Sequence, residues 1–593
     1  MNSVTSPASS LKEVWRKYAE QLAGKEVQSP LNIGIEASFT ANSLIPFVGA
    51  PLVEAGLAPS IELGPYNQLF QVCLDYKSYF HSDLNVLILL FRLEDFALDD
   101  LLAFLQGDDT AFESASSKID LLVSALQKLR ASFKGSIIVN LPPFPSILPS
   151  HTLSLENSYG LGKLHRGLTS RFFEQVKNIP GIRICDFDAI QREHGLSRSF
   201  DSRQWYLYRQ PFTDSFLLTA GAVLARMVKA FRIAPKKCIV LDCDNTLWGG
   251  IIGEDGLGGI QLGDEFPGTA YRDFQRLLLY WRQQGILLAL ASKNNEADVW
   301  EVFDKHSGML LKREHISAWQ INWEPKSENI PKIAKVLNIG TDSLVFIDDN
   351  PAEIDYMRQA RPEVVSILLP EEPADIMATL RTISVFDRHE ITQEDRQRSD
   401  MMKAEEQRVA LGNNLSKEEF QKSLGLCIDF FPAREEDLDR ITQLINKTNQ
   451  FNLSTIRRSL DEVRELAKSS RHRIFGLRVS DKFGDYGLTG VVIAEFFPEG
   501  SELVIDTFLL SCRVLGRGVE TALLSVLAVE AQKEGATEVV ANFIPTAKNT
   551  PAAAFLPDHH FLSEDKKLWR LAVSQIPAVL PWISLAHLGG HKA

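Results

Sequence analysis

The chain has 593 residues and a formal net charge of −13 at pH 7, with 45% hydrophobic and 23% charged residues. This length exceeds what one hydrophobic core supports and predicts about three to five domains. The composition excludes wholesale disorder, and the acidity argues against a nucleic-acid backbone as the main partner, because nucleic-acid-binding proteins usually present a basic surface.

The N-terminal 24 residues scatter Ser, Lys, Glu and Arg, and they lack the apolar core of a signal peptide. No apolar run approaches the roughly 18 residues that a membrane-spanning helix needs. The six cysteines are widely spaced and include no CxxC pair, which indicates neither a disulfide framework nor a zinc site. We therefore expect a cytoplasmic protein with free thiols and no membrane contact.

The first segment, residues 1–232, alternates apolar strands with helices. We expect strands at 31–38, 85–91 and 135–140 and a helix at 117–133. Such alternation predicts an α/β domain with a parallel sheet and helices on its faces.

In this segment Ser38 follows the first predicted strand and Asn140 ends the third, and here the chain resembles SGNH-type hydrolases. That family would place Asp-x-x-His near the end of the domain, where this chain has Asp214-Ser215-Phe216-Leu217. Without a histidine base Ser38 has no evident activation. His151 is an alternative base, although a histidine after a Pro-Ser loop is more often exposed. We therefore expect an SGNH-hydrolase-like domain with a docking or structural role.

The second segment, residues 233–387, again alternates strands and helices. We expect strands at 238–241, 286–291, 315–319 and 343–347 and a helix at 271–284. A highly charged stretch follows, and we interpret residues 388–425 as a solvated helical linker. Since the carboxyl ends of parallel strands line one crevice, polar residues that follow these strands should meet there.

Two aspartates, Asp242 and Asp244, follow the first strand of this segment, one residue apart. A carboxylate can attack phosphorus and form an aspartyl-phosphate, which splits one difficult displacement into two easier ones. We therefore predict Asp242 as the nucleophile and Asp244 as the general acid and base. Taken alone, an Asp-x-Asp pair is more often a pair of loop carboxylates.

Further polar residues follow the other strands of this segment. A carboxylate nucleophile and a phosphoryl group repel each other, so a Mg²⁺ ion with hard oxygen ligands is expected. The predicted ligands are carboxylates: Asp242, Asp244, Asp348 and Asp349. We predict that Ser292 donates to a phosphoryl oxygen and that Lys326 neutralises charge on the nucleophile and the phosphate. Each residue taken alone has a simpler interpretation: Ser292 as a helix cap and Lys326 as a solvated charge.

The ordered set of these four stretches resembles the haloacid dehalogenase (HAD) superfamily. The gaps are 50 residues from Asp242 to Ser292, 34 from there to Lys326 and 22 from there to Asp348. The large cap domains of the superfamily would be inserted in the first or second gap, and neither gap has room for one. We therefore expect an uncapped site, open to a group presented by another macromolecule.

Longer motifs resemble the FkbH-like branch of that superfamily, subclass IIIC. They are residues 241–256 (LDCDNTLWGGIIGEDG), 292–295 (SKNN), 323–326 (WEPK) and 346–353 (FIDDNPAE). The resemblance implies an enzyme that takes D-1,3-bisphosphoglycerate, loads a D-glyceryl group onto the phosphopantetheine thiol of an acyl carrier protein and removes phosphate. Such reactions start the route to unusual polyketide extender units.

Cys243 lies between the two aspartates, and two interpretations of it stay open. Mechanisms in the family invoke a covalent glyceryl-cysteine, and a thiolate is a good nucleophile toward an acyl phosphate. Alternatively, Cys243 is a small apolar residue on the opposite side of the strand from Asp242, as strand alternation favours. Cys243 is therefore a candidate catalytic residue, and a buried apolar residue is the alternative.

The last segment, residues 426–593, mixes helices with strands that look antiparallel. The expected elements are a helix at 435–447 and strands at 473–479, 489–497 and 501–510, with a hairpin loop at 498–500 between the last two. This pattern predicts an α+β domain.

A glycine-rich turn after strand 501–510 opens a helix, and backbone N–H groups of such a turn can bind a pyrophosphate. The turn resembles the R-x-x-G-x-G site of GNAT N-acetyltransferases, and we predict cofactor-binding residues there: Arg513, Gly516, Arg517, Gly518 and Asn549. An ordinary helix start is the simpler interpretation. A GNAT-like domain could be a true acetyltransferase or a fold reused to hold a phosphopantetheine arm, and we favour the second role because it needs no additional substrate.

Together these patterns favour a Mg²⁺-dependent glyceryl transferase and phosphatase that acts on an acyl carrier protein. Two alternatives are a HAD phosphatase for a carrier-bound or small phosphorylated substrate, and a scaffold that binds carrier proteins without catalysis.

Overall fold

The computed structural model describes residues 7–22, 30–146, 158–233, 235–381, 383–387, 416–497, 501–546, 549–563 and 567–586. The hairpin loop expected at 498–500, residues 388–415 of the expected linker and His151 lie outside this part of the chain. None of the described helices is long and apolar enough to cross a membrane.

The chain divides into two compact units, Met1–Pro235 with Ile383–Glu390, and Lys236–Thr382 with Ile391–Ala593. Residues 383–387 therefore belong with the first unit, whereas the sequence pattern had assigned them to the second segment. The reason is local: the Arg226 guanidinium donates two hydrogen bonds to the Asp387 carboxylate, at 2.7 and 3.0 Å.

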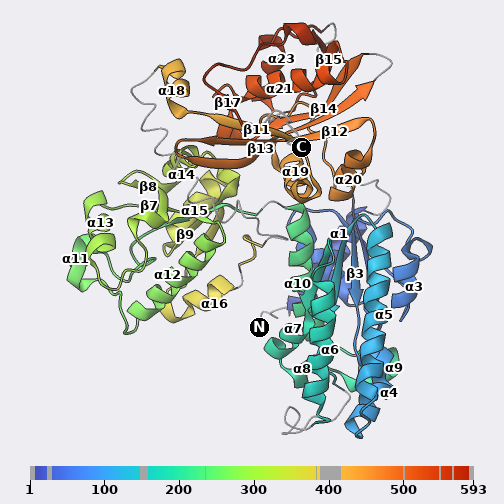
Figure 1. The fold of residues 1–593 in the computed structure, drawn as a ribbon. Helices are drawn as coiled ribbons and strands as arrows, with labels where there is room; N and C mark the ends of the chain where they lie inside the picture. Colours follow the sequence, from blue (N-terminus) through green and yellow to red (C-terminus); the bar gives the residue numbers. More distant parts are fainter. Residues whose placement is uncertain are drawn as a thin grey trace. The chain divides into compact units, whose positions relative to one another are not determined.

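The first unit is built on a five-stranded parallel sheet with strand order β2-β1-β3-β4-β5. Figure 1 labels β3 of this sheet and, in the same unit, helices α5, α6 and α10. The strands are β1 (Leu31–Ala37), β2 (Pro59–Leu63), β3 (Val86–Leu90), β4 (Ser136–Leu141) and β5 (Ile182–Asp186). The helices are α1 (Pro7–Leu22), α2 (Leu44–Glu54), α3 (Leu69–Leu74), α4 (Glu94–Leu105), α5 (Ala111–Ser132), α6 (Leu161–Val176), α7 (Phe187–His194), α8 (Leu196–Ser199), α9 (Ser202–Tyr208) and α10 (Asp214–Arg232). The expected parallel α/β sheet is confirmed.

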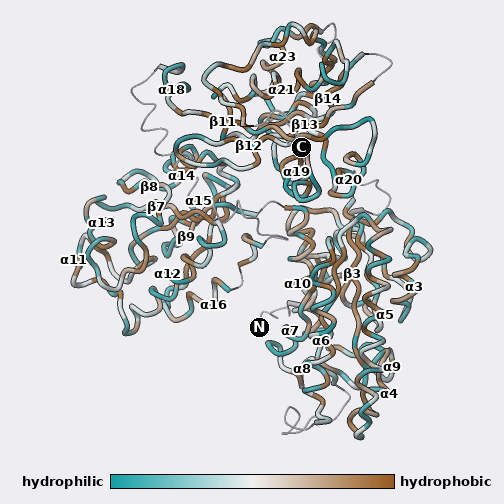
Figure 2. Tube along the Cα trace, viewed as in Figure 1, coloured by the Kyte–Doolittle hydropathy of each residue, from teal (hydrophilic) through white to brown (hydrophobic). Residues whose placement is uncertain are grey.

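Both faces of this sheet are covered by helices. Along β3, Leu87 and Leu89 pack into a core that includes α5, while Ile88 and Leu90 pack into a second core that includes α2 and α10. Because both faces are buried, the strand is a continuous apolar run, which is typical of parallel sheets (Figure 2).

The second sheet is also parallel and five-stranded, with order β10-β9-β6-β7-β8. Its strands are β6 (Cys238–Leu241), β7 (Leu287–Ser292), β8 (Ile316–Ile321), β9 (Leu344–Asp348) and β10 (Val365–Leu368). Its helices are α11 (Ile252–Gly259), α12 (Gly268–Gln283), α13 (Glu296–Lys305), α14 (Lys326–Val336), α15 (Pro351–Ala360) and α16 (Ile376–Arg381). Residues 242–326 are all described and contain no further domain, as the short gaps predict.

The third sheet has seven strands in the order β16-β15-β14-β13-β12-β11-β17. The strands are β11 (Cys427–Pro432), β12 (His472–Asp481), β13 (Gly484–Phe497), β14 (Glu502–Leu510), β15 (Glu538–Asn542), β16 (Leu568–Ala572) and β17 (Ser584–Leu585). The helices are α18 (Lys417–Leu424), α19 (Glu435–Lys447), α20 (Leu460–Lys468), α21 (Val519–Lys533), α22 (Thr550–Ala553) and α23 (Phe555–Asp558). Strands β11 to β14 pair antiparallel, which confirms the expected pattern, and β14 pairs parallel with β15 after the crossover through α21.

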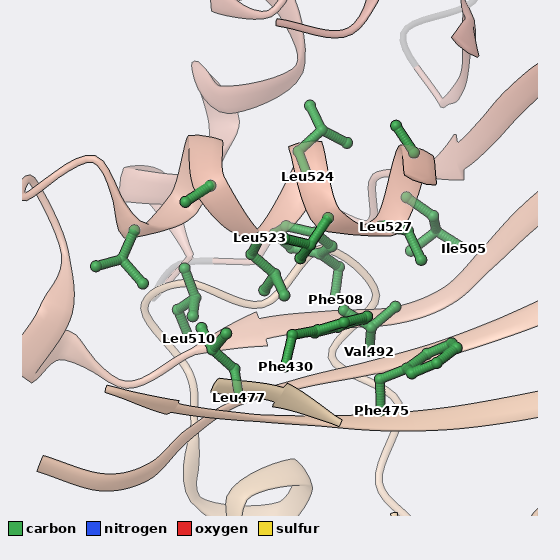
Figure 3. Packing of buried hydrophobic residues seen from close by; sticks show 14 of the residues in the cluster. Phe430, Phe475, Leu477, Val492, Ile505, Phe508, Leu510, Leu523, Leu524 and Leu527 are labelled. Carbon is green, nitrogen blue, oxygen red and sulfur yellow. The ribbon is translucent and has the colours of Figure 1, made fainter. Parts of the chain in front are cut away.

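Helix α21 covers one face of this third sheet. Leu523 and Leu527 of the helix point toward Phe508 and Val492 of the sheet (Figure 3). This packing anchors the start of α21, and with it the glycine-rich turn that precedes the helix.

Candidate functional site: a carboxylate cluster at the edge of a parallel sheet

The candidate site lies at the carboxyl edge of the second sheet, where β6 and β9 are neighbours. From β6 the chain runs outward through β7 and β8 on one side and later returns to β9 on the other. Ligands of open α/β sheets bind at such a switch point, because loops from both sides diverge there. Asp242 directly follows β6, and Asp348 is the last residue of β9.

Three of the four predicted metal ligands come together at this edge. Each of Asp242, Asp348 and Asp349 offers a carboxylate oxygen, and these oxygens lie within 4.8 Å of one another. Lys326, the first residue of α14, lies against the group: its Nζ is 3.0 Å from Asp242 Oδ1 and 2.6 Å from Asp348 Oδ2. Asp242, Asp348 and Lys326 are buried, and Asp349 is half-buried.

The electrostatics of this cluster favour a further cation. Burial and the neighbouring Asp242 carboxylate raise the pKa of Asp348 to about 6 and also raise the pKa of Asp349. Burial by itself would lower the pKa of Lys326, but Asp242 and Asp348 outweigh it and hold that pKa above its ordinary value. The ammonium group balances one of three carboxylate charges. The remaining negative charge and the hard oxygen donors fit a divalent cation such as Mg²⁺.

Asp244, the fourth predicted ligand, is not part of this group. Its carboxylate accepts hydrogen bonds from three donors, each at 3.0 Å: Trp248 Nε1 and the Ile252 backbone N–H on Oδ1, and Asn294 Nδ2 on Oδ2. The chain turns directly after Cys243, whose carbonyl accepts from the backbone N–H groups of residues 246 and 247, and the Asp244 carboxylate bonds to its three donors instead of joining the three gathered carboxylates. Burial raises the pKa of Asp244, as a proton donor near neutral pH requires.

Ser292 ends β7 and is buried beside Asp244. Asn294 Nδ2 lies 3.0 Å from Ser292 Oγ and from Asp244 Oδ2, so one amide connects the predicted phosphate-binding hydroxyl to the predicted general acid. Asn294 and Trp248 stand in the motifs at 292–295 and 241–256, but sequence reasoning gives them no role. The signal that could have identified them is their spacing: each carries a hydrogen-bond donor, Asn294 two residues after Ser292 and Trp248 four residues after Asp244.

Cys243 is fully buried. Burial raises the pKa of its thiol well above the ordinary value, and the neighbouring Asp242 carboxylate adds to the shift. An acyl relay needs an accessible thiolate, so this environment favours the alternative in which Cys243 is a small buried residue.

The glycine-rich turn of the third sheet precedes α21. Gly516 and Gly518 have φ angles of +73° and +85°, a region that side chains strain, so the turn needs glycine for backbone reasons alone. Arg517 is buried and donates to the Tyr486 hydroxyl, and Arg513 is half-buried. The sequence pattern is therefore explained by the turn and the core, while the cofactor role of these residues stays a prediction.

Asn549 was predicted to bind the same cofactor, but its side chain is bonded within the fold. Its Nδ2 donates to the carbonyls of Asn452 at 3.0 Å and Ile544 at 2.9 Å, and its Oδ1 accepts from the Thr546 N–H at 2.7 Å. These bonds hold a segment, residues 451–453, that lies against β14. Asn549 is 1% exposed, and both hydrogens of its Nδ2 are used in bonds within the fold. The side chain therefore has no donor left for a cofactor.

Ser38 lies at the carboxyl edge of the first sheet and is buried. Its Oγ donates to Asp95 Oδ2 at 2.5 Å and accepts from the Arg92 N–H at 3.2 Å. The Asn140 side-chain amide accepts from the Phe91 N–H and donates to the Phe91 carbonyl, and Asp214 pairs with Lys12. Among the described residues, no histidine hydrogen-bonds to Ser38. The lack of activation and the SGNH likeness both stay predictions, since His151 lies outside the described residues.

Known structures resemble parts of this chain. A crystal structure described as the N-terminal part of the protein BF1531 from Bacteroides fragilis, containing a phosphatase domain complexed with Mg, is 25% identical; the match covers 64% of this chain and 98% of that one, with a TM-score of 0.55. A putative acetyltransferase of the GNAT family from Desulfovibrio desulfuricans is 15% identical over 25% of this chain and 99% of its own, with a TM-score of 0.21. Spermidine N-acetyltransferase from Vibrio cholerae, in complex with CoA and spermine, is 16% identical over 25% of this chain and 97% of its own, also with a TM-score of 0.21.

No protein-family model matches the sequence, and no curated protein matches it. The class that fold and site define is therefore a multidomain α/β protein with a carboxylate cluster at the switch point of a parallel sheet.

Proposed function

We propose that this chain is a Mg²⁺-dependent phosphatase of the HAD type. The observation that carries the proposal is the group of Asp242, Asp348 and Asp349 with Lys326 at the carboxyl edge of β6 and β9. The Bacteroides structure supports it, because that protein contains a phosphatase domain complexed with Mg.

More particularly, we propose a glyceryl transferase and phosphatase of the FkbH-like kind, with an acyl carrier protein as partner. The motifs at 241–256, 292–295, 323–326 and 346–353 support this substrate class. The lack of any inserted domain between residues 242 and 326 also supports it, since an uncapped site admits a group carried by another protein.

In phosphate removal, Asp242, Asp348 and Asp349 would hold Mg²⁺, which supplies positive charge to the phosphoryl oxygens. An Asp242 carboxylate oxygen attacks phosphorus, the bond to the leaving oxygen breaks, and Asp244 gives that oxygen its proton. Water then attacks the aspartyl-phosphate and returns a proton to Asp244, which restores both carboxyl groups. Lys326 and Ser292 stabilise the charge on the phosphoryl group throughout.

In acyl loading, the carrier thiol attacks the acyl carbon of 1,3-bisphosphoglycerate. The carbon–oxygen bond to the acyl phosphate breaks, and the thiol proton leaves with the released phosphate. The phosphate ester that remains on the glyceryl group is then the substrate for Asp242. A GNAT-like third domain that receives the phosphopantetheine arm belongs to this same proposal.

The test is to incubate the protein with Mg²⁺, enzymatically generated 1,3-bisphosphoglycerate and a holo carrier protein, and to weigh both proteins by intact mass spectrometry. A glyceryl adduct on the carrier is the expected result. Phosphate release without an adduct would favour a phosphatase that does not transfer the glyceryl group. No turnover would favour a scaffold that binds carrier proteins without catalysis.

A second arm of that experiment concerns Cys243. Because the side chain is fully buried, we expect Cys243→Ala to keep glyceryl transfer within about threefold of the unmodified enzyme, by analogy with a small core substitution. Loss of transfer with phosphate release intact would instead establish the covalent relay.

A further inference from the structure

We propose that Trp248 and Asn294 are positioning residues that hold Asp244 so that its Oδ2 oxygen, and not Oδ1, exchanges the proton in phosphoryl transfer. This inference rests on the proposed phosphatase function and deepens it. Its basis is the unequal way in which the two oxygens of Asp244 are hydrogen-bonded.

Oδ1 of Asp244 is saturated. It accepts from Trp248 Nε1 and from the Ile252 N–H, both at 3.0 Å. A carboxylate oxygen offers about two lone-pair sites, so these donors leave no place on Oδ1 for a proton or a substrate oxygen.

Oδ2 keeps one open site. Its hydrogen-bond donor is Asn294 Nδ2, at 3.0 Å. The nitrogen of that amide, and not its oxygen, must face Asp244, because a carboxylate needs a donor. The second lone-pair site of Oδ2 is therefore the place from which a proton can pass to a leaving oxygen and to which water can return one.

Asn294 also fixes where that proton is delivered. The same Nδ2 is 3.0 Å from Ser292 Oγ. Since an amide nitrogen carries two hydrogens, it can donate to both groups, and Ser292 then accepts with its oxygen. The proton-transfer oxygen and the phosphate-binding hydroxyl are thus held by one side chain.

Trp248 is itself fixed in place. It is fully buried, and its ring meets Phe303 edge to face, with centroids 6.4 Å apart and an interplanar angle of 82°. Asn245, with a φ angle of +50°, accepts from the Gly250 N–H at 2.8 Å and closes the loop that carries Trp248. The indole can therefore hold Asp244 without reorganising when substrate binds.

The test compares kcat/KM for two phosphate esters in the full-length protein with Mg²⁺. 4-Nitrophenyl phosphate releases a phenolate that leaves without a proton, whereas glycerol 3-phosphate releases an alkoxide that needs one. Trp248→Phe keeps a ring of similar shape but loses the N–H donor. We expect it to lower kcat/KM for glycerol 3-phosphate at least about tenfold more than for 4-nitrophenyl phosphate, because general acid catalysis serves the alkoxide.

Trp300→Phe is the matched control. Trp300 packs on the same Phe303, with centroids 5.2 Å apart, and donates to Glu296, which lies outside the site. Its ratio of the two kcat/KM values should equal that of the unmodified protein. Asn294→Ala removes the donor on the other side of Asp244 and also the support of Ser292, so it should lower kcat/KM for both esters and lower that for glycerol 3-phosphate more. This variant keeps the test available if Trp248→Phe fails to fold.

An equal loss for both esters in Trp248→Phe and Asn294→Ala, or no loss for either, would overturn the positioning role while the phosphatase function stands. An unmodified protein that hydrolyses neither ester nor any carrier-bound phosphate would overturn the phosphatase function, and this inference with it.

Discussion

At the scale of single residues, the carboxylates of the candidate site are distinguishable by what they contact. Asp242 and Asp348 share Lys326, and Asp349 contacts the Thr246 hydroxyl at 3.4 Å. Asp349 is thus the member of the group with the weakest protein contact and the one whose oxygens are most available to a metal ion.

Asp349→Asn should therefore weaken Mg²⁺ binding more than it harms the chemistry. An amide oxygen lacks the charge of a carboxylate, so we expect the Mg²⁺ concentration for half-maximal activity to rise by about tenfold or more, with most of the rate restored at high Mg²⁺. The measurement is phosphatase rate against Mg²⁺ concentration. Asp355→Asn, an exposed site on α15, is the control, and an unchanged Mg²⁺ dependence in Asp349→Asn would exclude Asp349 as a ligand.

Glu36 of β1 is a second residue with a marked environment. It is fully buried, its Oε1 accepts from the Gln68 N–H at 2.9 Å, and its Oε2 has no hydrogen-bond partner. Burial raises its pKa from 4.5 to about 8. The folded chain thus binds this proton more tightly than the unfolded chain, and stability falls as pH rises through the window from 4.5 to 8.

Glu36→Gln removes this titration and keeps the shape of the side chain. We expect the variant and the unmodified protein to have equal unfolding free energies near pH 4.5. Above pH 8 the variant should be more stable, by at most about 5 kcal/mol if the unfolded chain titrates normally. Denaturant unfolding of the first unit across this pH range measures the difference, and parallel curves at all pH values would contradict the assignment.

At the scale of elements, the strands were the predictable part of the fold. Residues 85–91 and 238–241 are apolar because both faces of their sheets are covered, and this pattern is visible without a structure. Strand β2 (Pro59–Leu63) escaped prediction because it lies at an edge and is only partly buried, so its sequence is mixed. The segment at 451–453 escaped as well, since three residues are too few to show a strand pattern. It bonds to β14 through its main chain and packs against it through Phe451 and Phe508.

The same distinction explains which parts of the site were predictable. Asp242, Ser292 and Asp348 follow or end strands, and parallel topology alone brings such positions together. The separate hydrogen bonds of Asp244 depend on the turn after Cys243, and the inward contacts of Arg517 and Asn549 depend on tertiary packing that no motif encodes.

Asn549→Ala tests whether the segment at 451–453 needs its amide support. Loss of the donor removes one buried hydrogen bond, to the Asn452 carbonyl, and one partly buried hydrogen bond, to the Ile544 carbonyl. We expect the third sheet to lose about 1–3 kcal/mol of unfolding free energy. Asn446→Ala is the control, because the exposed Asn446 also bonds to the main chain, through Arg458, and water can replace it. If Asn549 is a cofactor ligand instead, stability should be unchanged and the thermal shift caused by added coenzyme A should disappear.

At the scale of the whole molecule, separate cores make a single unfolding transition unexpected. The two compact units have their own sheets and hydrophobic cores, and the carboxylate cluster belongs to one of them. A ligand stabilises the part of a protein that binds it. We therefore expect scanning calorimetry to resolve more than one transition, with Mg²⁺ raising the midpoint of one of them and Glu36→Gln at pH 8.5 raising that of another. One transition that responds to both changes would show that the units unfold together.

The switch point between β6 and β9 also bears on how the protein folds. Thr246 and Asp349, which meet there, are 103 residues apart in sequence. Contacts between such distant segments form late, because the loop between them must close first. The metal-binding group is therefore assembled only when β9 pairs with β6. The time at which Mg²⁺ binding appears during refolding would then show when these two strands pair.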